Sequence, residues 1–132
     1  PMIIRIDQRS TEPLYLQLRS QIIASIAQGD LVPGDVLPSV RSLANDLGIN
    51  LHTVNKAYAV LRDDGYVLMR GRSGAYVADP ANHPQESIAA GHARLDDSLF
   101  ALALEYRAHG GEKAEFLARA QSQAERAYKE EQ

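Results

Sequence analysis

The sequence lacks cysteine entirely, and it contains no long apolar run. Without cysteine, neither a disulfide nor a thiolate-bound metal contributes to the fold. No apolar stretch approaches the roughly 20 residues that a membrane-spanning helix requires, and no signal-peptide pattern is present. We therefore expect a cytoplasmic protein that makes no contact with a membrane.

Catalytic and metal-binding patterns are missing as well. The four histidines, at positions 52, 83, 92 and 109, are scattered, and no Ser/His/Asp set, phosphate-cradling loop or metal-ligand spacing appears. His92 and Asp96, four residues apart on a predicted helix, come closest to a ligand pair, but a partly buried histidine beside a solvated acid is the better interpretation. We predict that the chain is not an enzyme and holds neither metal nor cofactor.

Positive charge is scarce too. The formal net charge of −3 argues against a protein that coats nucleic acid through bulk charge. Residues 1–80 contain eight Lys/Arg and eight Asp/Glu, whereas residues 81–132 contain six and nine. A nucleic-acid site must therefore be a local cluster, and the first 80 residues repel a phosphate backbone less.

What the sequence does contain is a pair of short helical patterns within residues 38–65. Apolar residues recur at helical spacing on both sides of Gly48, at positions 40, 43, 44 and 47 and then at 49, 54, 57, 58 and 61. Gly48 suits the left-handed end of a helix, and Asn50 can accept a hydrogen bond from the N–H groups of the next one. The pattern predicts a helix-turn-helix, whose second helix lies in the DNA major groove.

Several polar residues in this stretch are candidates for contacting DNA. At the start of the second helix we expect His52, Thr53 and Asn55 to read bases and Lys56 to bind phosphate, although an ordinary solvated helix face has a similar pattern. Ser39 can cap the first helix. Arg41 follows in the first turn, where a cation gains nothing from the helix dipole, which favours an external phosphate over a plain surface arginine.

Beyond the second helix, residues 66–70 and 75–77 are two β-type runs around a four-residue loop with two glycines. They predict a hairpin, which is the wing of a winged helix. Arg70 and Arg72 stand at its tip, and Gly71 and Gly74 allow a close approach to DNA. An ordinary exposed hairpin is disfavoured because two cations fall within three residues.

Elements ahead of the helix-turn-helix are simpler. Apolar residues repeat every four positions from Leu14 to Ile26, which predicts a helix that has Pro13 in its first turn, ends at Gly29 and packs across the helix-turn-helix. Ile3, Ile4 and Ile6 suggest a short strand.

The last third of the chain predicts two more helices. After a proline-containing linker at 79–84, residues 85–107 carry a heptad-like apolar seam, 110–111 is a glycine break, and a final helix covers 112 to about 128. Two helices cannot enclose a core, so we expect a second chain to cover them by two-fold symmetry, the alternative being packing against the chain's own wing domain. The candidate dimer contacts are Ile88, Leu95, Leu99, Leu102, Tyr106 and Phe116.

The motif residues resemble the N-terminal domain of GntR-type bacterial transcription regulators over residues 13–78. The matching positions are Tyr15, Leu16, Gln17, Leu18, Ile26, Gly29, Leu31, Pro33, Gly34, Leu37, Pro38, Ser39, Arg41, Leu43, Ala44, Leu47, Gly48, Thr53, Val54, Ala57, Tyr58, Leu61, Gly65, Gly71, Gly74 and Val77. The resemblance implies homodimers that bind DNA through Arg41, Thr53 and its neighbours, and the wing glycines. The short tail resembles the YtrA-type branch, whose members often repress transporter operons.

One departure from that family pattern concerns specificity. Many relatives have arginine or serine where this chain has Leu51, and some have arginine at Asn55. Because leucine can contact a thymine methyl group and asparagine suits adenine, we expect an A·T-leaning half-site.

Together these patterns predict a mainly α fold with a small β-hairpin: a winged helix-turn-helix domain (1–78), a linker (79–84) and a two-helix C-terminal dimerisation hairpin (85–132). The leading hypothesis is a sequence-specific transcriptional regulator, a repressor that binds a double-stranded DNA operator as a homodimer. The alternative is a winged-helix module for protein contact. Whether a small-molecule effector exists is left open.

Overall fold

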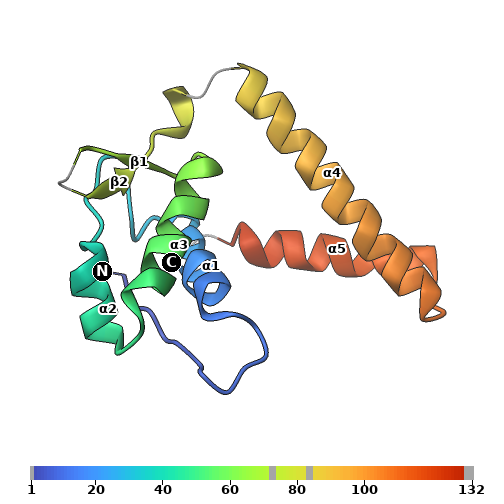
Figure 1. The fold of residues 1–132 in the computed structure, drawn as a ribbon. Helices are drawn as coiled ribbons and strands as arrows, with labels where there is room; N and C mark the ends of the chain where they lie inside the picture. Colours follow the sequence, from blue (N-terminus) through green and yellow to red (C-terminus); the bar gives the residue numbers. More distant parts are fainter. Residues whose placement is uncertain (1, 72–73, 83–84, 130–132) are drawn as a thin grey trace. The chain divides into compact units, whose positions relative to one another are not determined.

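The computed structural model describes residues 2–71, 74–82 and 85–129 (Figure 1). Its elements, in chain order, are α1 (Leu14–Ala27), α2 (Val40–Leu47), α3 (Leu51–Asp63), β1 (Val67–Met69), β2 (Ala75–Val77), the short 3-10 helix η1 (Pro80–Asn82), α4 (Gln85–Ala108) and α5 (Lys113–Ala127). The predicted mainly helical fold with a two-stranded β-hairpin is confirmed. The chain divides into two compact units, 1–82 and 83–132, which are described separately.

The first unit is built around one face of α3. Val54, Ala57, Tyr58 and Leu61 from this helix are fully or almost fully buried. They pack in one cluster with apolar residues of α1, α2, the strands and the α1–α2 connection, namely Leu18, Ile22, Leu31, Leu37, Leu43, Ala44, Val67, Ala75 and Val77. Burying each large side chain contributes roughly 1.5–3 kcal/mol. The orientation of α3 is therefore set by its buried face.

The wing is tied into this core through the segment before α2. Strands β1 and β2 are antiparallel, with Leu68 opposite Tyr76. On the other side of β2, Leu37 N–H donates to the Ala75 carbonyl and Val77 N–H donates to the Asp35 carbonyl, both at 2.8 Å. Strand β2 thus lies between β1 and the α1–α2 connection, so the wing and the segment that leads into α2 share one hydrogen-bonded layer.

The strand predicted near Ile3, Ile4 and Ile6 is wrong, because residues 2–7 form no strand. Instead, two glutamine side chains four residues apart on α1 pair with this extended segment. Arg5 N–H donates to Gln21 Oε1 (2.7 Å), and Gln21 Nε2 donates to the Arg5 carbonyl (2.6 Å). Gln17 makes the same two bonds with Asp7, both at 2.9 Å. A side-chain amide carries one donor group and one acceptor, so it replaces a strand partner.

The second unit is the hairpin of α4 and α5, which turns at Gly110, where φ is +89°. The Tyr106 ring packs so closely on Gly111 that an added Cβ would overlap it. Tyr106 also lies 6.0 Å from the Phe116 ring, centroid to centroid. No residue of α5 is buried, and large apolar side chains of both helices are exposed. Among the described residues, this unit encloses no core of its own.

No helix in the described part of the chain combines the length and apolarity required to cross a lipid bilayer. The predicted linker contains η1, and its residues 83–84 lie outside the described residues.

We expect Tyr58→Phe to reduce the free energy of unfolding by about 1 kcal/mol, because the buried Tyr58 hydroxyl donates to the Pro38 carbonyl at 2.7 Å. Burial also raises the pKa of Tyr58 above its ordinary value of 10.0. The unfolded chain therefore releases this proton first as pH rises, so the contribution is intact below pH 10.0 and is lost progressively above it.

Urea unfolding at about pH 8 and about pH 11 measures both effects. The unmodified chain should lose more stability between these pH values than Tyr58→Phe does. Equal losses in the two proteins would contradict the assignment.

Candidate nucleic-acid interface

The start of α3 is shaped by two side-chain caps and one glycine. Ser42 N–H donates to Ser39 Oγ (3.0 Å) at the start of α2, and His52 N–H donates to Asn50 Oδ1 (2.8 Å) at the start of α3. Between the helices, Gly48 has a φ of +66°, which favours glycine. Each cap satisfies a backbone N–H that has no partner inside its helix. These three predicted features are confirmed.

The candidate base-reading residues lie on the surface of α3. His52, Asn55 and Lys56 are exposed and Thr53 is half-buried, whereas Val54 between them is fully buried. Leu51, the first residue of the helix, is 43% exposed although it is a large apolar residue. The first turns of α3 therefore present three hydrogen-bonding groups, one cation and one apolar group to solvent.

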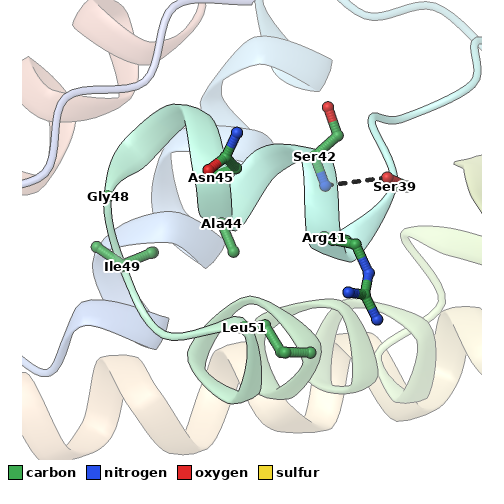
Figure 2. A pocket seen from close by; sticks show the side chains of 8 residues that line it. All are labelled: Ser39, Arg41, Ser42, Ala44, Asn45, Gly48, Ile49 and Leu51. Atoms are coloured by element: carbon green, nitrogen blue, oxygen red, sulfur yellow. Dashed lines mark hydrogen bonds between the residues drawn. The ribbon is translucent and has the colours of Figure 1, made fainter.

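A shallow hollow runs between α2 and the start of α3 (Figure 2). Figure 2 shows Arg41 extending from the start of α2 toward α3, whose first residue, Leu51, lines the same hollow. The lining residues are Ser39, Arg41, Ser42, Ala44, Asn45, Gly48, Ile49 and Leu51. The hollow thus brings the predicted residues Ser39 and Arg41 together with Leu51.

Two of the lining residues were missed from the sequence. Ser42 and Asn45 are exposed on α2 and add polar groups to the wall that carries Arg41. The available signal was helical spacing, since Asn45 is four residues after Arg41 and so falls on the same face.

Two of the other candidate cations, Lys56 and Arg70, lie over aromatic rings. Lys56 Nζ lies 4.1 Å from the centroid of the Tyr15 ring, and the Arg70 guanidinium carbon lies 4.7 Å from the centroid of the Tyr76 ring. Neither contact was predicted from the sequence, in which Tyr15 is one of the family-matching positions and Tyr76 falls in the second predicted strand of the hairpin.

The tip of the wing is built on glycines. Gly71 has a φ of +53° and Gly74 a φ of +102°, so both adopt the left-handed region. Arg70 N–H donates to the Gly74 carbonyl at 3.0 Å and closes the hairpin. Arg72, the second predicted wing cation, lies outside the described residues.

The described residues include no cluster of three or more His, Cys, Asp or Glu side chains that could hold a metal ion. His92 and Asp96 are both exposed on α4 of the single chain. In the C-terminal unit, Ile88, Leu95, Leu99 and Leu102 are between 42% and 55% exposed.

Comparison of sequences identifies related proteins. Residues 14–77 match the family model described as bacterial regulatory proteins, gntR family. The HTH-type transcriptional regulator Rv1152 of Mycobacterium tuberculosis is 41% identical over 81 residues, which cover 60% of this chain and 67% of that protein. The HTH-type transcriptional repressor YtrA of Bacillus subtilis is 42% identical over 80 residues, which cover 60% of this chain and 61% of that protein. The match thus spans about two thirds of each relative.

Solved structures show the same similarity. YtrA from Sulfolobus acidocaldarius, a GntR-family transcription factor, is 40% identical with a TM-score of 0.57, covering 73% of this chain and 98% of that chain. The AraR DBD in complex with operator ORX1 is 25% identical with a TM-score of 0.52, covering 57% of this chain and 96% of that chain.

Proposed function

Because the chain belongs to the GntR family of bacterial regulatory proteins, and is therefore a DNA-binding transcriptional regulator rather than an enzyme, we propose that it is a repressor that binds a two-fold operator as a homodimer. The observation that carries this proposal is the exposed, capped start of α3. One face of this helix is buried in the core, while His52 and Asn55 are exposed and Thr53 is half-buried. A helix that enters the major groove requires this arrangement.

In this proposal the cations hold the DNA backbone. Arg41, Lys56, Arg70 and Arg72 contact phosphates, which positions the protein without reading sequence. Gly71 and Gly74 let the wing tip approach the backbone or the minor groove. The Ser39 hydroxyl oxygen accepts a hydrogen bond within α2, which leaves its hydrogen to donate to a phosphate oxygen.

Base recognition falls to the first two turns of α3. His52, Thr53 and Asn55 offer hydrogen-bonding groups, and the amide of Asn55 matches the donor and acceptor edge of adenine. Leu51 lies in the hollow beside Arg41, where it would contact a thymine methyl group. An A·T-leaning half-site follows.

Homodimerisation is proposed for the C-terminal hairpin. Its exposed apolar side chains include Ile88, Leu95, Leu99 and Leu102, and a second copy would cover them. Tyr106 and Phe116 also contact each other within the hairpin, so they would contribute only their remaining surface. In this proposal residues 1–78 form the DNA-binding domain, residues 79–84 the linker and residues 85–132 the dimerisation tail.

Repression is proposed because the similar Bacillus subtilis YtrA is named a transcriptional repressor. A dimer bound over a promoter would exclude RNA polymerase by occupying the same DNA. On the basis of the family resemblance, we extend this proposal to control of a transporter operon and to a response to a small-molecule effector.

We expect Arg41→Ala to weaken binding to every DNA sequence and to lower the slope of log affinity against log salt by about 0.9, because it removes one phosphate contact. Asn55→Ala should instead relax the preference at one base pair, where the discrimination is about 1–3 kcal/mol. Fluorescence anisotropy over a salt series, with the selected operator and a mixed-sequence duplex, measures both.

These roles would be contradicted if both variants lost affinity for the selected operator but kept their full affinity for the mixed-sequence duplex. If binding did not depend on salt, or if the chain bound no promoter DNA, a winged-helix module for protein contact would replace the proposal.

Selection of binding sites from a random duplex library should return A·T pairs at the positions facing Leu51 and Asn55. Leu51→Arg is the matched variant, because arginine pairs with guanine in the major groove and should move that position toward G·C. A selection that returned G·C with the unmodified chain would contradict the assignment.

We expect Leu99→Glu to shift the chain from dimer to monomer, because it places a charge in the proposed apolar interface. Ser98→Glu is the control, since it adds the same charge at the neighbouring exposed position. Sedimentation equilibrium measures both. A monomeric unmodified chain, or equal dissociation of the two variants, would contradict dimerisation through this face.

A further inference from the structure

We propose that Tyr15 of α1 is a positioning residue for DNA binding, whose ring holds the Lys56 ammonium where it meets a DNA phosphate. The inference rests on the proposed function and adds a residue from outside the helix-turn-helix. Its basis is the 4.1 Å distance between Lys56 Nζ and the centroid of the Tyr15 ring. An ammonium within about 6 Å of a tyrosine ring is attracted by the electrons of the ring face.

The ring is a fixed support, whereas the lysine is not. Tyr15 is partly buried and packs against the hydrophobic core, so its ring is held by α1. Lys56 is exposed on α3, and its four-carbon stem is flexible. Contact with the ring restricts the ammonium before DNA arrives, which lowers the conformational entropy lost on binding.

A ring also leaves the positive charge of the lysine intact. A carboxylate partner would neutralise the charge, but an ammonium on a ring face keeps N–H donors for a phosphate. Neither salt bridge found among the described residues includes Lys56. These bridges join Arg19 to Asp64 (3.0 Å) and Arg62 to Asp63 (3.3 Å), at the other end of α3. Arg62 of α3 and Arg19 of α1 are thus paired with carboxylates near the C-terminal end of α3. Lys56, near the start of α3, is in neither of these ion pairs.

The wing shows a parallel arrangement, since the Arg70 guanidinium carbon lies 4.7 Å from the centroid of the Tyr76 ring. Two cations proposed to bind phosphate therefore each lie over a tyrosine. The Tyr15–Lys56 pair is tested in preference to the Tyr76–Arg70 pair, because Lys56 belongs to the recognition helix and the contact joins α1 to α3.

A double-mutant cycle on the full chain tests the inference, using Tyr15→Leu, Lys56→Met and the two combined. Tyr15→Phe is the matched control, because it keeps the ring and removes only the hydroxyl. Affinity for a mixed-sequence duplex is measured by anisotropy over a salt series, since phosphate contacts do not depend on sequence. Thermal unfolding of each variant reports its stability separately.

Lys56→Met should weaken binding and lower the salt slope by about 0.9. Tyr15→Leu should weaken binding about two- to five-fold in the unmodified background and leave the affinity unchanged in the Lys56→Met background. Tyr15→Phe should bind as the unmodified chain does. This coupling distinguishes positioning from a structural role, because a loss caused by weaker packing would persist without Lys56.

Equal losses from Tyr15→Leu in both backgrounds would overturn the inference, as would unchanged binding by Lys56→Met. If the unmodified chain bound no duplex at any salt concentration, the proposed function itself would fail and the inference with it. Binding without coupling would leave the proposed function standing and remove only the role of Tyr15.

A second measurement uses only the unmodified chain, so it does not require that a Tyr15 variant folds. The chain has three lysines, at positions 56, 113 and 129. In the NMR spectrum of the unmodified, DNA-free chain, the ε-methylene protons of Lys56 should be shifted upfield of those of Lys113 and Lys129 by the ring current of Tyr15. Coincident shifts for the three lysines would overturn the inference.

Discussion

Burial of one face of α3 is the interaction on which the rest of the first unit depends. Val54, Ala57, Tyr58 and Leu61 lie in the core, so the helix cannot rotate without exposing them to water. That constraint holds the opposite face in solvent and the N-terminal turns beside α2. The Tyr58 hydroxyl adds direction, because its bond to the Pro38 carbonyl ties α3 to the residue just before the Ser39 cap. One face of α3 thus belongs to the core, and the opposite face is the surface that is accessible to a partner.

Much of this fold could be predicted because its signals are local. Helical spacing, Gly48, Asn50 and Ser39 act within a few residues of their own position, and the paired glycines mark the hairpin. The pairing of Gln17 and Gln21 with residues 5 and 7 could not be predicted in this way, because a short run rich in isoleucine suggests a strand whatever its partner is. The contact of Lys56 with Tyr15 joins positions far apart in sequence, so no local sequence pattern predicts it.

The two units are stabilised in different ways. The first encloses a continuous cluster of apolar side chains, whereas the described part of the second is joined mainly at the corner where Tyr106, Gly111 and Phe116 meet. A helical hairpin with its apolar faces in water gains little from folding alone. In the proposed dimer, association would supply the missing burial, so the stability of the tail would depend on protein concentration. DNA binding at paired half-sites would be linked to the same equilibrium.

An acidic chain binds a polyanion only if its charges are arranged locally. The backbone N–H groups at the start of α3 carry the positive end of the helix dipole, and Lys56 adds a full charge one turn later. The carboxylates of Asp63 and Asp64 lie at the opposite end of the helix and are paired with Arg62 and Arg19. The net charge of −3 resides in residues 81–132, whose repulsion by phosphate disfavours approach through the tail. Charge separation along the chain therefore favours the orientation in which the helix-turn-helix meets the duplex first.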